Sequence, residues 1–100
     1  MYGTMFRMRA KAGQEQAVVD LFNGWERERK PKVKGALTGF LMKPDNKPGE
    51  LVGAGVFVDK ASHIANANDP EQHQWFLRLR ELLDADPEWE DGEFVMGNLG

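Results

Sequence analysis

The segment ELVGAGVFVD, residues 50–59, constrains the fold most, because it predicts a β-strand with two apolar faces. Successive side chains of a strand point to opposite faces. One face therefore carries Val52, Ala54, Val56 and Val58, and the other carries Leu51, Gly53, Gly55 and Phe57. One layer of helices covers only one side of a sheet, so this strand needs a second cover as well.

Three further strands are predicted, the first of them from a period of two in the sequence. They occupy residues 1–9, 34–43 and 93–98. The turn formers PDNKPG, residues 44–49, join the second strand to the third, so these two strands should form a hairpin. In the second strand, alternation places Leu37 and Leu41 on one side and Ala36, Phe40 and Met42 on the other.

A first helix is predicted at residues 14–29 from an apolar stripe of helical period, made by Val18, Leu21, Phe22 and Trp25. Pro31 should end this helix, because the residue before a proline is pushed out of helical geometry. A short helix is expected at residues 60–68.

A longer helix should begin within DPEQ, where Asp69 suits the N-cap and Pro70 suits the first helical position. Its apolar stripe continues through Trp75, Phe76, Leu79, Leu82 and Leu83. The segment DADPEWEDG should then break the pattern, with Trp89 holding a turn against the rest of the protein.

The resulting order, β-α-β-β-α-β, predicts a ferredoxin-like α+β fold, in which an antiparallel sheet carries both helices on one face. The 100 residues fit a single domain, 1–100. A second copy of the same sheet is the simplest cover for the other apolar face, which predicts a homodimer through the sheet face. The alternative is that glycines and alanines make that face only weakly apolar, so that water tolerates it.

Composition argues against several classes of site. The chain has no cysteine, which excludes a disulfide framework, a thiol nucleophile and thiolate metal ligands, and fits a reducing cytoplasm. No apolar run approaches the roughly 20 residues that span a bilayer, and MYGTMFRMRAKAG is not a signal peptide, so a cytoplasmic protein is expected. The net charge of −3 argues against nucleic-acid binding. The mixed charges of ERERKPKVK, residues 26–34, indicate a solvated helix end and turn.

The two histidines do not predict a metal site. His63 and His73 are ten residues apart, whereas two zinc ligands on one helix face are separated by three or four, and no third ligand is evident. His73 lies on the flank of its helix's apolar stripe and is expected at the surface. His63 follows the third strand. A neutral histidine can act as a base near pH 7, although most histidines are only hydrogen-bonded polar residues.

Amide and aromatic side chains supply the other candidates. Asparagines near helix starts, such as Asn66, usually satisfy backbone groups. Gln72 lies at the capping-box position and also near the middle of an apolar stripe, so it either caps the helix or points into a cavity. Phe22, Trp25 and Trp75 lie on apolar stripes, where core packing is the usual role, but such aromatics also line pockets for planar ligands.

Three segments together resemble the antibiotic-biosynthesis-monooxygenase-like superfamily: GTMFRMRAKAGQEQAVVDLFNGWE, residues 35–83 and DPEWEDGEF. The most specific parts are PDNKPGE, residues 59–70 and DPEWEDGE. The resemblance implies a dimeric α+β barrel of ferredoxin-like protomers, with a small-molecule pocket between sheet and helices in each. Enzymes of this superfamily include cofactor-independent quinone-forming monooxygenases and haem-degrading enzymes, and other members have no known reaction.

The resemblance also implies roles for the candidate residues. His63 would be the catalytic base and Asn66 would stabilise developing negative charge, with Phe22, Trp25, Gln72 and Trp75 binding the substrate. No cofactor and no metal is expected. Haem degradation is not favoured, because YGTMFRM lacks the asparagine and IANAN lacks the tryptophan of the haem-degrading members. The expected function is therefore a cofactor-independent monooxygenase acting on a small aromatic or polyketide-like compound. The alternative is a non-catalytic small-molecule-binding or stress-response dimer.

Overall fold

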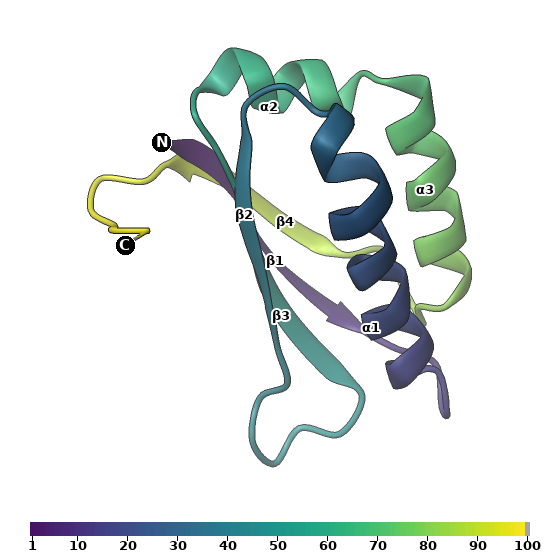
Figure 1. Ribbon diagram of the computed structural model, residues 1–100. Coiled ribbons are helices and arrows are strands. Elements are labelled where there is room, and N and C mark those ends of the chain that lie inside the picture. The colour runs from purple at the N-terminus through teal and green to yellow at the C-terminus, as the bar shows by residue number, and fades with distance from the viewer. Residues whose placement is uncertain (100) are drawn as a thin grey trace.

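The computed structural model describes residues 1–99, which form a sheet with helices on one of its faces (Figure 1). Along the chain the elements are β1 (Tyr2–Arg9), α1 (Glu15–Gly24), the π-helix η1 (Trp25–Arg29), the 3-10 helix η2 (Lys30–Lys32), β2 (Ala36–Met42), β3 (Glu50–Phe57), α2 (Lys60–Ala67), α3 (Pro70–Glu81) and β4 (Glu88–Glu93). The C-terminal tail lies on the side of the sheet away from the helices (Figure 1).

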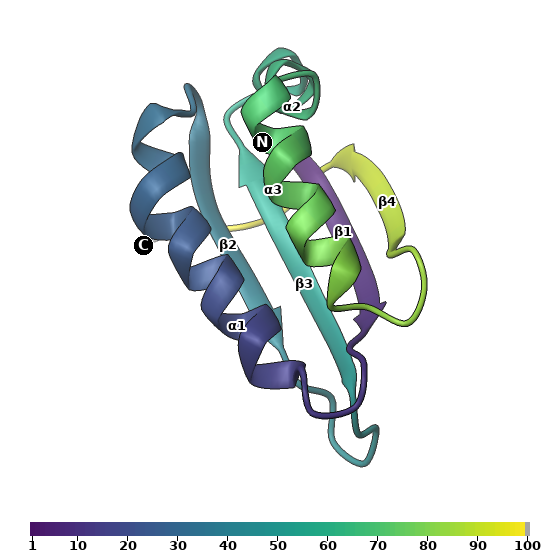
Figure 2. The ribbon, with the colours of Figure 1, turned by 90° about the vertical axis from the view of Figure 1, so that its right-hand side faces the viewer.

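The four strands form one antiparallel sheet in the order β2-β3-β1-β4. Helices α1 and α3 lie across one face of this sheet, and α2 lies at one of its ends (Figure 2). This arrangement confirms the predicted ferredoxin-like α+β fold. The strand with two apolar faces, β3, lies between β2 and β1 in the interior of the sheet.

The hydrophobic core lies where β1 finishes and β3 begins. Met8 and Leu51 pair across these two strands, and both face the helices. Val18 from α1, Leu79 from α3 and Leu83 beyond it are fully buried against them. Burying one such side chain stabilises the fold by about 1.5–3 kcal/mol relative to leaving it exposed. These five residues define what we call the packed end of the protein.

The first helical segment runs further than the sequence predicts. After α1 it continues as the π-helix η1, in which the Lys30 N–H donates to the Trp25 carbonyl, and then as η2, which contains Pro31. The predicted end at residue 29 coincides with the end of η1, but the prediction that the residue before Pro31 leaves helical geometry is wrong, since Lys30 keeps helical φ and ψ and η2 follows. An α-helix rejects proline because the ring collides with the carbonyl four residues back, and the change of helical pitch around Pro31 avoids that contact.

Aspartates begin the next two helices. The Asp59 carboxylate accepts a hydrogen bond from the Ser62 N–H at 2.8 Å, and the Asp69 carboxylate accepts one from the Glu71 N–H at 2.9 Å. The prediction of Asp69 as an N-cap followed by Pro70 is confirmed. Within residues 1–99, no helix is both long and apolar enough to cross a membrane.

The last strand lies earlier than predicted, at Glu88–Glu93 rather than at residues 93–98. It pairs with β1, with Trp89 opposite Phe6. All six of its residues are exposed, and EWEDGE has no apolar alternation by which a strand would be predicted. Its acidic side chains suit an edge strand, because charge discourages pairing with other chains. Trp89 therefore lies in a strand and not in a turn.

Strand β2 contains a register shift that breaks the predicted alternation. Ala36 pairs with Phe57, but Thr38 already pairs with Val56, so β2 carries one extra residue at this point. Ala36 was predicted on the same side as Phe40. The shift places it instead beside Phe57, on the side that the helices cover.

Candidate functional site

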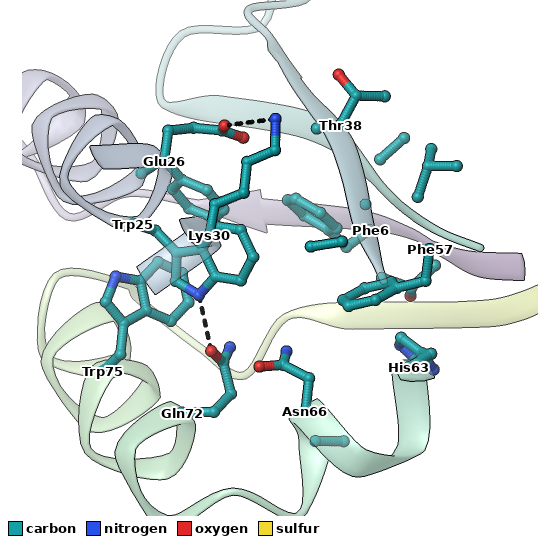
Figure 3. Close-up of a pocket in the computed structure, with 18 of the residues that line it drawn as sticks. Phe6, Trp25, Glu26, Lys30, Thr38, Phe57, His63, Asn66, Gln72 and Trp75 are labelled. Atoms are coloured by element: carbon teal, nitrogen blue, oxygen red, sulfur yellow. Dashed lines mark hydrogen bonds and ion pairs between the residues drawn. The ribbon is translucent and has the colours of Figure 1, made fainter. Parts of the chain in front are cut away.

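A cavity of about 550 Å³ lies between the helix-covered face of the sheet and helices α1, α2 and α3 (Figure 3). It lies at the opposite end of the sheet from the packed end. We call this region the open end, defined by Thr4, Gly39, Gly55, His63 and Asn66, all of which line the cavity. Its volume falls in the range of about 300–1,000 Å³ that is usual for small-molecule sites.

Missing side chains on the inner face of the sheet leave room for the cavity. A Cβ atom placed on Gly55 would meet only Thr4 Cγ2, at 3.8 Å. Gly39 pairs with Gly55, so two neighbouring inward positions carry no side chain. One step toward the packed end, a Cβ on Gly53 would lie 2.4 Å from Phe6 Cζ, because the Phe6 ring covers that glycine. The cavity therefore begins where this ring stops.

Aromatic rings from both layers form one side of the cavity. Phe6 stacks on Phe22 with ring centroids 5.7 Å apart, and Phe22 meets Trp75 edge to face at 5.0 Å. Trp89 adds a fourth ring, 5.3 Å from Phe6. Trp75 is buried in the core and also borders the cavity, so the structure places it at both positions considered from the sequence. This surface suits a flat apolar ligand.

A hydrogen bond between Trp25 and Gln72 joins η1 to α3 at the cavity. The indole Nε1 of Trp25 donates to Oε1 of Gln72 at 2.7 Å (Figure 3). Trp25 is the first residue of the π-helix, and single π-helical turns are frequent at functional sites. Of the two predicted alternatives for Gln72, the structure shows the cavity, which Gln72 lines. Its amide oxygen accepts from Trp25, and the Asp69 N–H that a capping box would direct to Gln72 donates to the Asn66 carbonyl at 3.0 Å instead.

His63 reaches the cavity from α2. Its half-buried ring lies 5.2 Å from the Phe57 ring and 5.5 Å from the Tyr2 ring, so apolar groups flank it. His73 is exposed on α3 and borders the same cavity, in agreement with its predicted surface position.

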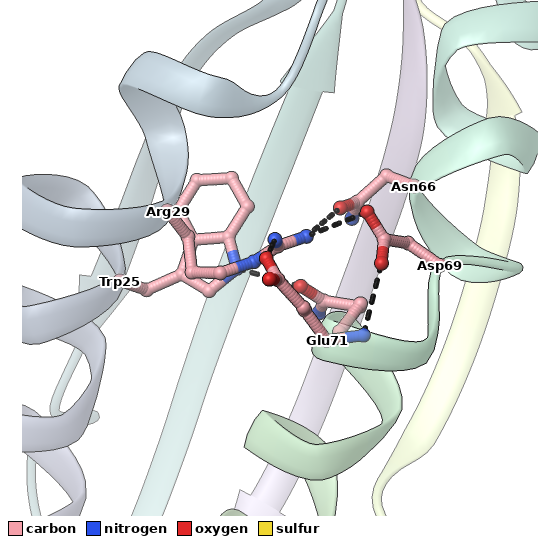
Figure 4. Close-up of polar contacts among 6 residues, drawn as sticks. Trp25, Arg29, Asn66, Asp69 and Glu71 are labelled. Atoms are coloured by element: carbon pink, nitrogen blue, oxygen red, sulfur yellow. Dashed lines mark hydrogen bonds and ion pairs between the residues drawn. The ribbon is translucent and has the colours of Figure 1, made fainter.

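Asn66 lies three residues after His63 and also lines the cavity. Its Oδ1 accepts a hydrogen bond from Nη2 of Arg29 at 3.1 Å (Figure 4). The same guanidinium contacts the Glu71 carboxylate at 2.7 Å and the Asp69 carboxylate at 3.5 Å. Arg29 thus links the π-helix to the junction of α2 and α3.

The sequence did not predict this role for Arg29. Its segment was expected to be a solvated helix end, yet only 11% of the Arg29 side chain is exposed. Its neighbours Arg27 and Glu28 are exposed as expected. The composition of a charged run does not indicate which of its members turns inward, so no local signal marked Arg29.

Among the described residues, the acidic and basic side chains that line the cavity, besides the two histidines, are Glu26, Lys30 and Asp91. Lys30 Nζ lies 3.6 Å from the Glu26 carboxylate, and both residues line the cavity. At the start of α2, hydrogen bonds from the backbone and side chain of Ser62 hold the pKa of the Asp59 carboxyl below its ordinary value of 3.8. Within residues 1–99, no group of three histidine or carboxylate side chains is placed to hold a metal ion.

The cavity brings together residues that lie far apart in the sequence. All six candidates line it: Phe22, Trp25, His63, Asn66, Gln72 and Trp75. They combine an apolar aromatic surface with one imidazole and two carboxamides. Such a set can bind a planar molecule, accept a proton from it and donate hydrogen bonds to an oxygen atom. The individual catalytic and binding roles stay predictions.

None of the known protein-family models matches the chain, and no curated protein matches it in sequence. Solved structures do match it. A protein of unknown function from Nitrosomonas europaea is 23% identical, with a TM-score of 0.80 over 99% of this chain and 93% of its own. SnoaB, a cofactor-independent oxygenase from Streptomyces nogalater solved as a variant, is 15% identical, with a TM-score of 0.79 over 99% and 97%.

A third structure is an antibiotic biosynthesis monooxygenase that is 15% identical, with a TM-score of 0.76 over 96% of this chain and all of its own. The chain has the antibiotic-biosynthesis-monooxygenase-like fold. This agrees with the resemblance seen in the sequence. Identities this low establish the shared fold and leave the reaction to be argued from the site.

Proposed function

We propose that this protein is a cofactor-independent monooxygenase that acts on a small aromatic or polyketide-like compound bound between sheet and helices. The main support is that one apolar cavity holds both a potential base, His63, and potential anion stabilisers, Asn66 and Gln72. The oxygenase activity in the name of SnoaB, which shares the fold, is a second support. The absence of cysteine supports a cytoplasmic location.

The proposed chemistry uses the reactivity of the substrate itself. With an anthrone, His63 removes a proton from the methylene carbon, and the electron pair moves onto the carbonyl oxygen as an enolate. The carbanion form reacts with O2 to make a C–O bond, and the proton returns to the peroxide. The hydroperoxide then loses water to leave a second carbonyl. One oxygen atom enters the product and the other leaves as water, so no reductant is needed.

The protein would favour this reaction in two ways. Asn66 donates a hydrogen bond to the enolate oxygen, where negative charge develops. The aromatic side of the cavity keeps water away from the carbanion, which would otherwise be reprotonated. Phe22, Trp25 and Trp75 hold the ring system flat against this surface.

Oxygen uptake with anthrone tests the proposal. We expect His63→Ala and Asn66→Ala each to lower the rate at least tenfold, since a general base typically contributes about 10²–10⁴-fold and an oxyanion donor about 10²–10³-fold. His73→Ala is the matched control, because His73 is exposed and borders the same cavity. Equal rates for wild type and all three variants would remove the roles of His63 and Asn66.

The alternative, a non-catalytic small-molecule-binding or stress-response dimer, would use the same cavity. Anthrone that raises the melting temperature without any oxygen uptake would favour it, because a ligand that binds only the native state stabilises that state.

We also propose that the protein forms a homodimer through the outer face of the sheet. Phe40 and Met42 of β2 are 63% and 56% exposed. Met5 on β1 lies in the same row of paired residues as Phe40, and it too is exposed. Large apolar side chains that share one uncovered face usually mark an interaction surface.

Sedimentation at micromolar concentration tests the dimer. Sedimentation of the wild type should give a molar mass twice the 11.3 kDa of one chain. Phe40→Glu should shift it to the monomer, since a carboxylate would be buried against the second sheet. Leu77→Glu, on the exposed side of α3, is the matched control and should stay dimeric. A wild type that sediments as a single chain would exclude the dimer.

A further inference from the structure

The two carboxamides at the cavity have fixed orientations. The indole Nε1 of Trp25 and the guanidinium of Arg29 are donors only. They can therefore bond only to the oxygens of their partners, Oε1 of Gln72 at 2.7 Å and Oδ1 of Asn66 at 3.1 Å. With each oxygen engaged, the NH2 group of each carboxamide must point elsewhere.

Both NH2 groups are available to a ligand. Within residues 1–99, neither donates a hydrogen bond to another protein group. Figure 3 shows the amide nitrogens of Asn66 and Gln72 on the cavity side of their side chains. Both residues are half-buried and line the cavity, so a bound ligand would displace water from these donors.

We propose that Trp25 and Arg29 are positioning residues that present Asn66 and Gln72 as a pair of hydrogen-bond donors to an acceptor oxygen of the ligand. The inference rests on the proposed function to the extent that its substrate occupies this cavity. The ligand class follows from the donors. A planar compound with a carbonyl, enolate or phenolate oxygen gains from two N–H donors, whereas one with only hydroxyl or amino donors at that position leaves them unsatisfied.

Arg29 suits this role because it acts through Asn66. Arg29 is not among the described residues that line the cavity. Its guanidinium forms ion pairs with the carboxylates of Asp69 and Glu71, which offset its positive charge. What reaches the ligand is then the direction of the Asn66 amide, with little of the positive charge of Arg29.

Binding of 2-naphthol tests the inference without any turnover. Naphthol and naphtholate differ in absorbance, so the pKa of the bound hydroxyl can be measured directly. A pair of N–H donors stabilises the naphtholate and lowers the bound pKa, whereas desolvation by the apolar cavity raises it, so the bound pKa is compared between the wild type and variants that lack a donor. The probe 2-methylnaphthalene fills similar space without an oxygen and reports on the apolar surface alone.

Two uncharged variants of similar size, Asn66→Leu and Gln72→Met, remove one NH2 donor each. Neither adds a charge at the cavity, so a change in naphtholate binding reports the lost donor. We expect each to weaken naphtholate binding roughly tenfold or more, as for loss of a charge-assisted hydrogen bond, and to raise the bound pKa. Affinity for 2-methylnaphthalene should be unchanged.

The positioning residues are tested with the donors left in place. Trp25→Phe keeps an aromatic ring but removes the indole N–H, which frees Gln72 to rotate. Naphtholate binding should therefore fall severalfold, with a smaller change for 2-methylnaphthalene. Arg29→Met should raise the bound pKa in the same way. Arg29→Lys separates position from charge, because lysine restores the charge without the planar fork. Full rescue by lysine would mean that charge alone acts and would overturn the role of Arg29.

The outcome is independent of catalysis. A bound pKa that Asn66→Leu and Gln72→Met both leave unchanged would overturn the donor pair even if anthrone is oxidised. A bound pKa that both variants raise would establish the donor pair even if no oxygen is consumed. In that case the monooxygenase proposal would fail, and the site that binds an acceptor oxygen of a ligand would remain.

Discussion

The packed end and the open end lie between the same sheet and the same helices, yet one is filled and the other contains a cavity. The difference lies in the side chains that the strands direct inward. At the packed end they are Met8 and Leu51. Two residues further along β3 the Phe6 ring still covers Gly53, but at Gly55 nothing replaces the missing side chain.

This contrast explains how a domain of 100 residues can hold both a core and a cavity of about 550 Å³. The packed end supplies the burial that keeps the layers together, since four of its side chains are fully buried. The open end can then carry polar groups such as His63 and Asn66, whose burial would not stabilise the fold. Stability and binding are thus assigned to opposite ends of one layered structure.

The largest expected effect is at the packed end. Leu79→Ala should lower the free energy of unfolding by about 2–5 kcal/mol, because it removes a fully buried side chain and leaves a cavity. Leu77→Ala, on the same helix but 43% exposed, should change it by less than about 0.5 kcal/mol. Urea unfolding measures both. Similar losses in the two variants would contradict the assignment of stability to the packed end.

A pair of glycine variants locates the boundary between the two ends. Gly53→Ala should destabilise the protein by about 1–3 kcal/mol, since its Cβ would lie 2.4 Å from the Phe6 ring and 2.7 Å from the Phe40 carbonyl oxygen. Gly55→Ala should stabilise it by about 0.5–1 kcal/mol, because alanine restricts the unfolded chain and meets open space. Thermal unfolding compares them.

Ligand binding by a larger substitution at Gly55 gives a second test of the same boundary. Gly55→Val should fill part of the cavity and weaken 2-methylnaphthalene binding, while the fold stays intact. A destabilised Gly55→Ala, or a Gly55→Val variant that binds as tightly as wild type, would show that Gly55 does not border usable space.

The sequence predicts the fold well where periodicity is strong. The stripe from Trp75 to Leu83, the Asp69 cap and the two-faced strand β3 all led to correct elements. It fails at β4, because an exposed edge strand such as EWEDGE has no apolar face to reveal it. It also fails after Trp25, because the π-helix and the 3-10 turn accommodate Pro31 through tertiary structure that no local rule contains.

For the site, the sequence identifies residue types but not their connections. His63, Asn66 and Gln72 were selected as unusual polar residues or through the superfamily resemblance, and all line one cavity. Arg29 could not be selected, because its partners lie 37 and 42 residues away in the chain. A contact of that range depends on how α1, α2 and α3 pack, which the amphipathic pattern alone does not specify.

The smallest expected effect concerns acid at the start of α2, beside the open end. Because the pKa of Asp59 is lowered in the folded state, its contribution to stability is present above the ordinary value of 3.8 and is lost as the pH falls through the lowered value. Asp59→Asn keeps a capping side chain but does not titrate.

The melting temperature of the wild type should therefore exceed that of Asp59→Asn near neutral pH, and the difference should shrink toward zero in strong acid. Glu50→Gln is the matching variant at the packed end. A hydrogen bond from Arg7 lowers the Glu50 pKa, so the melting temperatures of the wild type and Glu50→Gln should also converge in acid. Asp59 caps the helix that carries His63 and Asn66, so acid should weaken naphthol binding more in the wild type than in Asp59→Asn. Equal acid sensitivity in the two proteins would mean that the Asp59 cap does not hold α2 at the cavity.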